Sequence, residues 1–128
     1  MSDLLDSLDH ITVLTENLEL TKDFYIKILG MEIDNNRPKF KFEGVLLSLN
    51  KRAVVHIVVR STHKVNEDSV PTLDHIAFKA NNIINVKKHL QNNAIPYEER
   101  ITPDNKISQL FIKDPNILKI ELSKLFVT

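Results

Sequence analysis

The tetrapeptide Leu-Asp-His-Ile occurs twice in this chain, at residues 8–11 and 73–76, and this repeat restricts the fold more than any other feature. The second copy begins 65 residues after the first, and the same offset carries His56 onto Glu121. Potential metal ligands therefore fall into two equivalent pairs. Self-similarity at a fixed spacing indicates that one structural unit is present twice.

Hydrophobic periodicity predicts the same order of elements in both halves. The first half is expected to form a strand, an amphipathic helix that Gly30 can terminate, and three short strands, at 8–14, 18–29, 31–35, 40–49 and 53–59. The second half repeats this order, with its helix ending at Ala94, at 73–79, 83–94, 95–102, 107–113 and 118–123. We therefore predict one α+β domain, 1–128, built from two βαβββ modules, 8–59 and 73–123, which a polar linker, 60–72, connects.

Composition restricts the possible partners and ligands. With 42% hydrophobic residues among 128, the chain suits one compact domain, and without cysteine any metal must be held by nitrogen and oxygen. Seventeen basic residues balance seventeen acidic ones, so nothing indicates a nucleic acid or an anionic membrane as partner. Because the N-terminus is not basic and no apolar run approaches about 20 residues, we expect a cytoplasmic protein.

The side chains on the two faces of the strands differ sharply, because alternate residues of a strand point to opposite faces. One face is apolar throughout and comprises Ile11, Val13, Val55, Ile57, Val59, Ile76, Phe78, Ile120 and Leu122. The opposite face mixes small, polar and apolar residues and carries His10, His56, His75 and Glu121. We expect the apolar face to pack under the helices and the mixed face to line a cleft.

These four residues have a second possible explanation. A single histidine on a half-buried strand is more often a hydrogen-bonded structural residue than a ligand. A buried carboxylate such as Glu121 needs a charged partner, which a divalent cation supplies, but Lys79 or Lys119 could supply it instead. Their placement at equivalent positions of a repeat favours the metal.

The chain resembles the vicinal oxygen chelate superfamily, which includes glyoxalase I, fosfomycin-resistance proteins, extradiol dioxygenases and bleomycin-binding (bleomycin resistance) proteins. The resemblance covers nearly the whole chain and rests on the βαβββ repeat and on residues 8–11, 24–25, 29–31, 73–78, 95–97, 113–115 and 120–122. It implies a curled mixed sheet of two modules around a metal cleft. It identifies no single activity, because members share the scaffold and differ in chemistry.

The resemblance also implies roles for individual residues. It places His10, His75 and Glu121 as metal ligands, with His56 as the fourth ligand or as an acid–base group. Such a set suits nickel, zinc, manganese or iron(II). The ion would stabilise an enolate or oxyanion of a small oxygenated substrate, with Glu121 and His56 as the expected catalytic bases. Glyoxalase I typically has a glutamate at the position of His56.

Two further residues are expected to contact the substrate, namely Thr12, which follows the first ligand, and Arg100. Arg37, Arg52, Arg60 and Arg100 could each bind an anionic group through paired hydrogen bonds, although a surface charge is the simpler explanation for each of the four. Arg100 is preferred among them.

Three functions follow as hypotheses. The first is a metal-dependent, glyoxalase-like lyase or isomerase, the second is an iron(II)-dependent dioxygenase, which would consume oxygen, and the third is a non-catalytic protein that binds a drug or another small molecule without metal. A homodimer is expected. The linker of about 13 residues can extend about 40 Å, so the modules could close a cleft within one chain or exchange with a partner chain.

Overall fold

The structure, a computed structural model, describes residue 4 and residues 7–38, 41–60 and 73–125. The chain divides into two compact units, unit 1 (Met1–Lys64) and unit 2 (Val65–Thr128). Apart from Arg60, the predicted linker at 60–72 lies outside the described residues. No helix among the described residues is long and apolar enough to cross a membrane.

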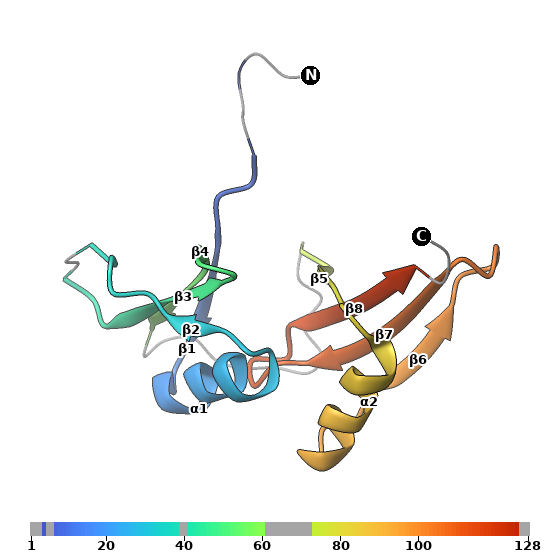
Figure 1. Cartoon of the computed structure of the whole chain (residues 1–128). Coiled ribbons are helices and arrows are strands. Elements are labelled where there is room, and N and C mark those ends of the chain that lie inside the picture. The colour runs from blue at the N-terminus through green and yellow to red at the C-terminus, as the bar shows by residue number, and fades with distance from the viewer. Residues whose placement is uncertain (1–3, 5–6, 39–40, 61–72, 126–128) are drawn as a thin grey trace. The chain divides into compact units, whose positions relative to one another are not determined.

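Unit 1 is a four-stranded mixed sheet with one helical segment (Figure 1). The sheet has the order β1-β4-β3-β2, in which β1 and β4 are parallel and the other neighbours are antiparallel. A π-helical turn, η1, extends the α-helix. The elements are β1 (Ile11–Thr15), α1 (Leu18–Asp23), η1 (Phe24–Ile28), β2 (Glu32–Ile33), β3 (Gly44–Leu49) and β4 (Arg52–Val59).

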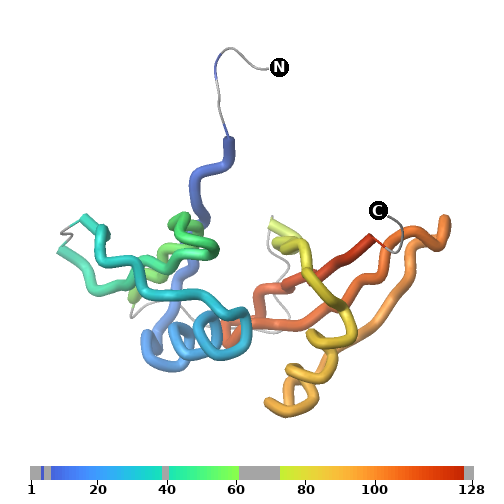
Figure 2. Tube along the Cα trace, in the orientation of Figure 1, coloured from blue at the N-terminus to red at the C-terminus, as the bar shows by residue number. Residues whose placement is uncertain are grey.

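Unit 2 repeats the connectivity of unit 1, as the chain trace in Figure 2 shows. Its sheet has the order β5-β8-β7-β6, again with a parallel pair, β5 and β8, and with antiparallel neighbours elsewhere. The elements are β5 (His75–Lys79), α2 (Ile83–Asn92), β6 (Glu98–Ile101), β7 (Ile107–Lys113) and β8 (Lys119–Leu125). The predicted α+β fold of two βαβββ units is confirmed.

The sequence repeat is preserved in the strand register. Residues that are 65 positions apart in the sequence occupy the same places in the two sheets. The equivalent pairs are Thr12 with His56 and Ala77 with Glu121 across the parallel strands, and Leu46 with His56 and Phe111 with Glu121 across the antiparallel strands. The offset read from the sequence therefore holds in three strands of each unit.

Both helices begin with the same cap. The Asn17 side chain accepts a hydrogen bond from the backbone N–H of Leu20 at 3.0 Å, and the Asn82 side chain accepts one from Asn85 at 3.1 Å. An asparagine at this position satisfies a backbone donor that has no partner within the helix. The repeat thus includes the asparagine N-cap of each helix.

The helices also end in the same backbone conformation. Gly30 and Ala94 both have positive φ values, 74° and 55°. After α2 the backbone N–H of Ile95 donates to the Leu90 carbonyl at 2.9 Å, and that of Ala94 donates to Gln91 at 3.1 Å, which forms a Schellman motif. Glycine adopts this conformation without cost, whereas alanine is strained there.

The predicted apolar face forms the core of each unit. Val55 and Ile57 in unit 1 and Ile120 in unit 2 are fully buried. The helical segments contribute Tyr25 and Leu90, which are also fully buried. Burying such side chains stabilises the fold by roughly 1.5–3 kcal/mol each, so each unit has an apolar core of its own.

Several strands are shorter than predicted, and β1 shows why. The predicted strand begins at Leu8, but the observed strand begins at Ile11, and Leu8 is exposed. The register would place Leu8 opposite Arg52, the first residue of β4, and there the Arg52 side chain donates to the Leu8 carbonyl instead. At this end of the sheet, a side-chain hydrogen bond takes the place of the backbone hydrogen bonds that would have extended β1 toward Leu8.

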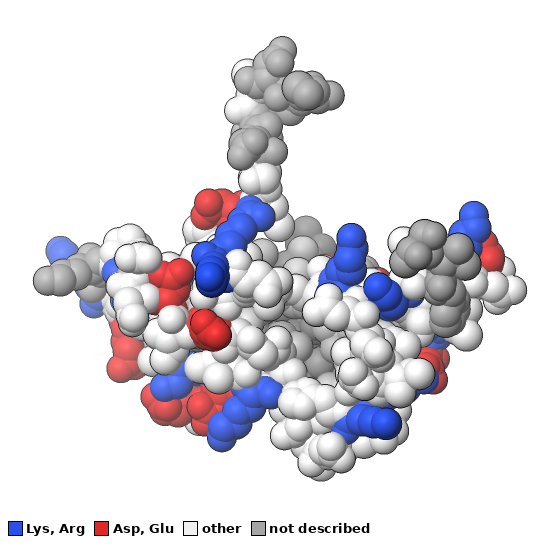
Figure 3. All heavy atoms as spheres, viewed as in Figure 1, with Lys and Arg blue, Asp and Glu red and all other residues white. Residues whose placement is uncertain are grey.

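Charges of both signs occur near one another on unit 1 (Figure 3). On α1, for example, Lys22 Nζ lies 2.9 Å from Glu19 Oε2. This arrangement agrees with the balanced composition of the chain.

Replacing Ala94 by glycine should stabilise the protein by about 1 kcal/mol, because glycine relieves the left-handed strain after α2. Lys88→Gly, on the exposed side of the same helix, is the matched control and should destabilise by about 0.5–1 kcal/mol. Urea unfolding of the three proteins measures both effects. A destabilised Ala94→Gly variant would contradict the assigned helix end.

Candidate metal site

Unit 1 brings two of the predicted ligands together. His10 precedes β1 and His56 lies on β4, and their ring centroids are 6.3 Å apart with an interplanar angle of 62°. His10 Nδ1 lies 2.6 Å from Asp9 Oδ2. Because the His10 side chain is 41% exposed, its ring is accessible to a ligand from solution.

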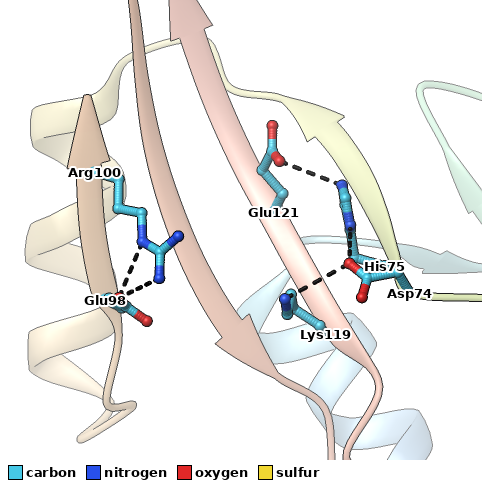
Figure 4. Close-up of polar contacts among 6 residues, drawn as sticks. All are labelled: Asp74, His75, Glu98, Arg100, Lys119 and Glu121. Carbon is cyan, nitrogen blue, oxygen red and sulfur yellow. Dashed lines mark hydrogen bonds and ion pairs between the residues drawn. The ribbon is translucent and has the colours of Figure 1, made fainter. Parts of the chain in front are cut away.

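Unit 2 brings the other two ligands together (Figure 4). His75, the first residue of β5, places Nε2 3.4 Å from Oε1 of Glu121 on β8. Its Nδ1 lies 2.7 Å from Asp74 Oδ2. The Glu121 side chain is only 13% exposed, so this carboxylate is close to being buried.

The contact between a histidine and the preceding aspartate is therefore present in both copies of the repeat. A carboxylate beside Nδ1 fixes the ring proton on that nitrogen and leaves the Nε2 lone pair for another partner. Histidines that bind metals commonly have this arrangement. Asp9 and Asp74 were not among the predicted site residues, although both belong to the repeated tetrapeptide, which was the available signal.

Lys119 interacts with Asp74. Its Nζ lies 3.6 Å from Asp74 Oδ2. The hydrogen bond from His75 and then the positive charge of Lys119 lower the pKa of Asp74 from its ordinary value. Asp74 is thus held as a charged hydrogen-bond acceptor, and Lys119, one of the two lysines considered as partners of Glu121, interacts with this aspartate.

His56 has a different environment from the other histidines. Its Nε2 accepts a hydrogen bond from Arg37 Nε at 3.0 Å, and the residue is only 8% exposed. Burial, then the charge of Arg37 and then that of His10 lower the pKa of His56 from its ordinary value. To bind a metal through Nε2, His56 would have to give up the bond from Arg37. Its predicted role as fourth ligand or base stays a prediction.

The donor atoms of the predicted ligands are of the chemical type that binds divalent ions. Each unit contributes two of the four predicted residues, all with nitrogen or oxygen donors, and the two Asp–His pairs leave Nε2 for coordination. Within the part of the chain that the structure describes, no cluster of three or more histidine, cysteine, aspartate or glutamate side chains could hold a metal.

The two residues predicted to contact substrate lie on the same faces as the ligands. Thr12 is exposed on β1, two residues after His10. Arg100 on β6 lies with Cζ 5.6 Å from the Phe111 ring centroid, and Phe111 pairs with Glu121. However, Arg100 Nε and Nη2 both donate to Glu98 Oε1, at 3.0 and 2.8 Å (Figure 4). Arg100 is therefore already paired with a carboxylate.

The paired βαβββ units define a glyoxalase-type fold. A profile of the Glyoxalase/Bleomycin resistance protein/Dioxygenase superfamily matches residues 7–122, and the chain belongs to this superfamily. The resemblance inferred from the sequence is confirmed. The superfamily includes enzymes, so membership alone leaves the activity of this chain open.

Similar proteins include one from a plant and two bacterial proteins of known structure. "Glyoxylase I 4" of Arabidopsis thaliana is 28% identical over an alignment of 123 residues, and the alignment covers 92% of this chain and 70% of that protein. A glyoxalase family protein from Enterococcus faecalis is 26% identical, with a TM-score of 0.74 over 91% of this chain and 96% of that chain. A fosfomycin resistance protein from Listeria monocytogenes shares the fold at 16% identity, with a TM-score of 0.75 over 97% of each chain.

Lowering the pH should destabilise the metal-free protein through His56. Its folded pKa lies below the unfolded value of about 6.5, so the unfolded chain takes up the proton first as the pH falls. The contribution of neutral His56 to the free energy of unfolding is fully present above the unfolded pKa, and it is lost as the pH falls through the folded pKa. Urea unfolding at several pH values between about 5 and 8 should show a weaker pH dependence in His56→Gln. An unchanged dependence would contradict the assigned environment.

Proposed function

We propose that this chain is a metal-dependent enzyme of the glyoxalase-like type, a lyase or isomerase that acts on a small oxygenated substrate. The observation that carries the proposal is the pair of Asp–His contacts at equivalent positions, with Glu121 beside the second histidine. Superfamily membership supports it, as does the relative named as a glyoxylase I.

In this proposal His10, His75 and Glu121 hold a divalent ion, which is nickel, zinc, manganese or iron(II). The bound ion supplies Lewis-acid stabilisation of negative charge on a substrate oxygen. The donors of the two units come either from one chain or from two chains of a homodimer. In an exchanged dimer, one subunit supplies His10 and His56 and the other supplies His75 and Glu121.

Glu121 is the proposed proton acceptor. Its Oε1 faces His75 Nε2, and the near-burial of its side chain limits contact with water. Phe111 lies opposite Glu121 in the sheet, and its ring meets that of His75 edge to face at 6.5 Å. An apolar ring beside a carboxylate lowers the local dielectric constant, which strengthens the interaction of the carboxylate with a charge or a proton. His56 is left to interact with Arg37.

Metal affinity tests the proposal directly. The wild-type protein should bind near-stoichiometric transition metal, measured by elemental mass spectrometry and by competition with a chromophoric chelator. His75→Ala and Glu121→Ala should lose it, and Asp74→Asn should weaken it by about 10–100-fold, because Asp74 orients the ligand. His89→Ala, at an exposed position on α2, is the control and should bind normally.

Two outcomes of this experiment would contradict the proposal. One is the absence of metal binding by the wild type after reconstitution with nickel, zinc, manganese and iron(II). The other is equal affinity in wild type and His75→Ala, which would mean that the ion binds elsewhere. Either result would favour a non-catalytic small-molecule-binding protein, whereas oxygen uptake by an iron-loaded protein would favour a dioxygenase.

A further inference from the structure

A basic and aromatic cluster, formed by Arg37, Phe42, His56 and Arg60, lies in unit 1. The Cζ atoms of Arg37 and Arg60 are 5.6 and 5.2 Å from the centroid of the Phe42 ring. Phe42 in turn lies 6.2 Å from the His56 ring, between centroids. Two guanidinium groups thus share one aromatic ring beside a predicted site residue.

The sheet register places these residues on one face. Gly44 pairs with Val58, and the backbone N–H of the next residue, Val59, donates to the Glu43 carbonyl at 2.9 Å. Continued by two positions, this antiparallel register sets Phe42 opposite Arg60. Because alternate residues share a face, Arg60 lies on the face that carries His56. The cluster is therefore a consequence of the fold.

Gly44 provides the space for Arg37. A Cβ atom at this position would clash with the Ile57 carbonyl oxygen and would lie 2.8 Å from Arg37 Nη2, so the missing side chain lets both the neighbouring strand and the guanidinium group lie close against β3. From there Arg37 Nε reaches His56 Nε2 at 3.0 Å, and Nη2 donates to the Phe42 carbonyl at 3.1 Å. These contacts fix the plane of the guanidinium group.

Unit 2 has no arginine cluster at the equivalent positions, although the rest of the repeat is in register. Its own basic and aromatic group is centred on Phe111, where Arg100 Cζ and Lys119 Nζ lie 5.6 and 5.8 Å from the ring centroid, and both of these cations interact with a carboxylate, Glu98 and Asp74 respectively. The counterparts of Phe42 and Arg60 pair with each other across β7 and β8, which verifies the correspondence. The residues 65 positions after Arg37, Phe42, Gly44 and Arg60 are Thr102, Ile107, Gln109 and Leu125. The paired arginines at these positions therefore occur in only one copy of the repeat, which suits recognition of one end of an asymmetric ligand.

Arg60 is exposed, and among the described residues its guanidinium group packs on Phe42 without a carboxylate partner. A bound anion would give the Arg60 guanidinium group a partner of opposite charge. A planar guanidinium group matches the paired oxygens of carboxylate and phosphoryl groups. Arg100 in unit 2 differs, because Glu98 already neutralises it.

We propose that Arg37 and Arg60, packed on Phe42, bind an anionic group of the ligand, either a carboxylate or a phosphoryl group, and that His56 is the positioning residue that orients Arg37. This proposal deepens the proposed function and rests on it for the identity of the ligand as the substrate. The substrate is then a small oxygenated acid, and Arg37 and Arg60, in place of Arg100, are the residues that select it.

Nuclear magnetic resonance of the arginine Nε–H groups can test this in chelator-treated, metal-free protein. Titration with inorganic phosphate and separately with acetate should shift the signals of Arg37 and Arg60 and leave that of Arg100 in place. Arg37→Gln and Arg60→Gln should each weaken binding by about tenfold, the effect of one charged hydrogen-bond partner. Arg52→Gln, at the other end of β4, is the matched control and should bind as the wild type does.

Further variants separate positioning from charge. Arg37→Lys keeps the charge but loses the planar fork, so it should bind more weakly than the wild type. His56→Leu should move the Arg37 Nε–H signal and weaken binding while the Arg60 signal still responds. Urea unfolding confirms that each variant is folded.

The outcomes distinguish this proposal from the metal proposal. If neither anion shifts Arg37 and Arg60, or if Arg52→Gln weakens binding as much as Arg60→Gln, the anion site is contradicted even where metal binds. If the anions bind and metal does not, the anion site stands as part of a binding protein. The anion with the stronger response identifies the group that the ligand carries.

Discussion

The hydrogen bond between a histidine and the aspartate before it is the interaction on which the proposed chemistry depends. It occurs at 2.6 Å between Asp9 and His10 and at 2.7 Å between Asp74 and His75. By holding Nδ1, each aspartate leaves Nε2 as the nitrogen that can bind a metal. In unit 2 that atom already lies 3.4 Å from the Glu121 carboxylate. Each unit thus provides an oriented donor beside a second site residue.

In the proposed function, the repeated positions of the two sheets bind the metal ion, and the arginine cluster of unit 1 binds the anionic group of the ligand. Equivalent positions in the two sheets carry the donors, because a 65-residue offset that preserves strand pairing also preserves side-chain direction. Arg37 and Arg60 belong to unit 1 alone, where Gly44 and Phe42 provide the space and the surface for them. Symmetric positions would hold the ion, and the asymmetric cluster would orient the ligand.

Much of the fold could be predicted from the sequence, because its strongest signals are local. Alternation along the strands predicted the buried faces, and Ile57 and Ile120 are fully buried as expected. The pairing of His10 with His56 and of His75 with Glu121 followed from the repeat. The strand ends were less predictable, because a side-chain contact such as that of Arg52 with the Leu8 carbonyl can replace ladder bonds.

The bond from Arg37 to His56 could not be predicted in the same way. Arg37 lies 19 residues before His56, outside any regular element, and its guanidinium group lies where a side chain at Gly44 would crowd it. No periodic pattern encodes such an approach. Asp9 and Asp74 were visible in the repeat, but their role required the distances to the histidine rings.

X-ray absorption spectroscopy of the nickel-loaded protein tests the central claim most directly, because it detects imidazole rings around the ion. We predict a nitrogen and oxygen environment in the wild type. At nickel concentrations high enough to load the weakened sites, the imidazole scattering should decrease in both His10→Ala and His75→Ala and stay unchanged in His89→Ala. The ion would then be held by donors from both copies of the repeat. Unchanged scattering in either His10→Ala or His75→Ala, at full nickel content, would contradict the account.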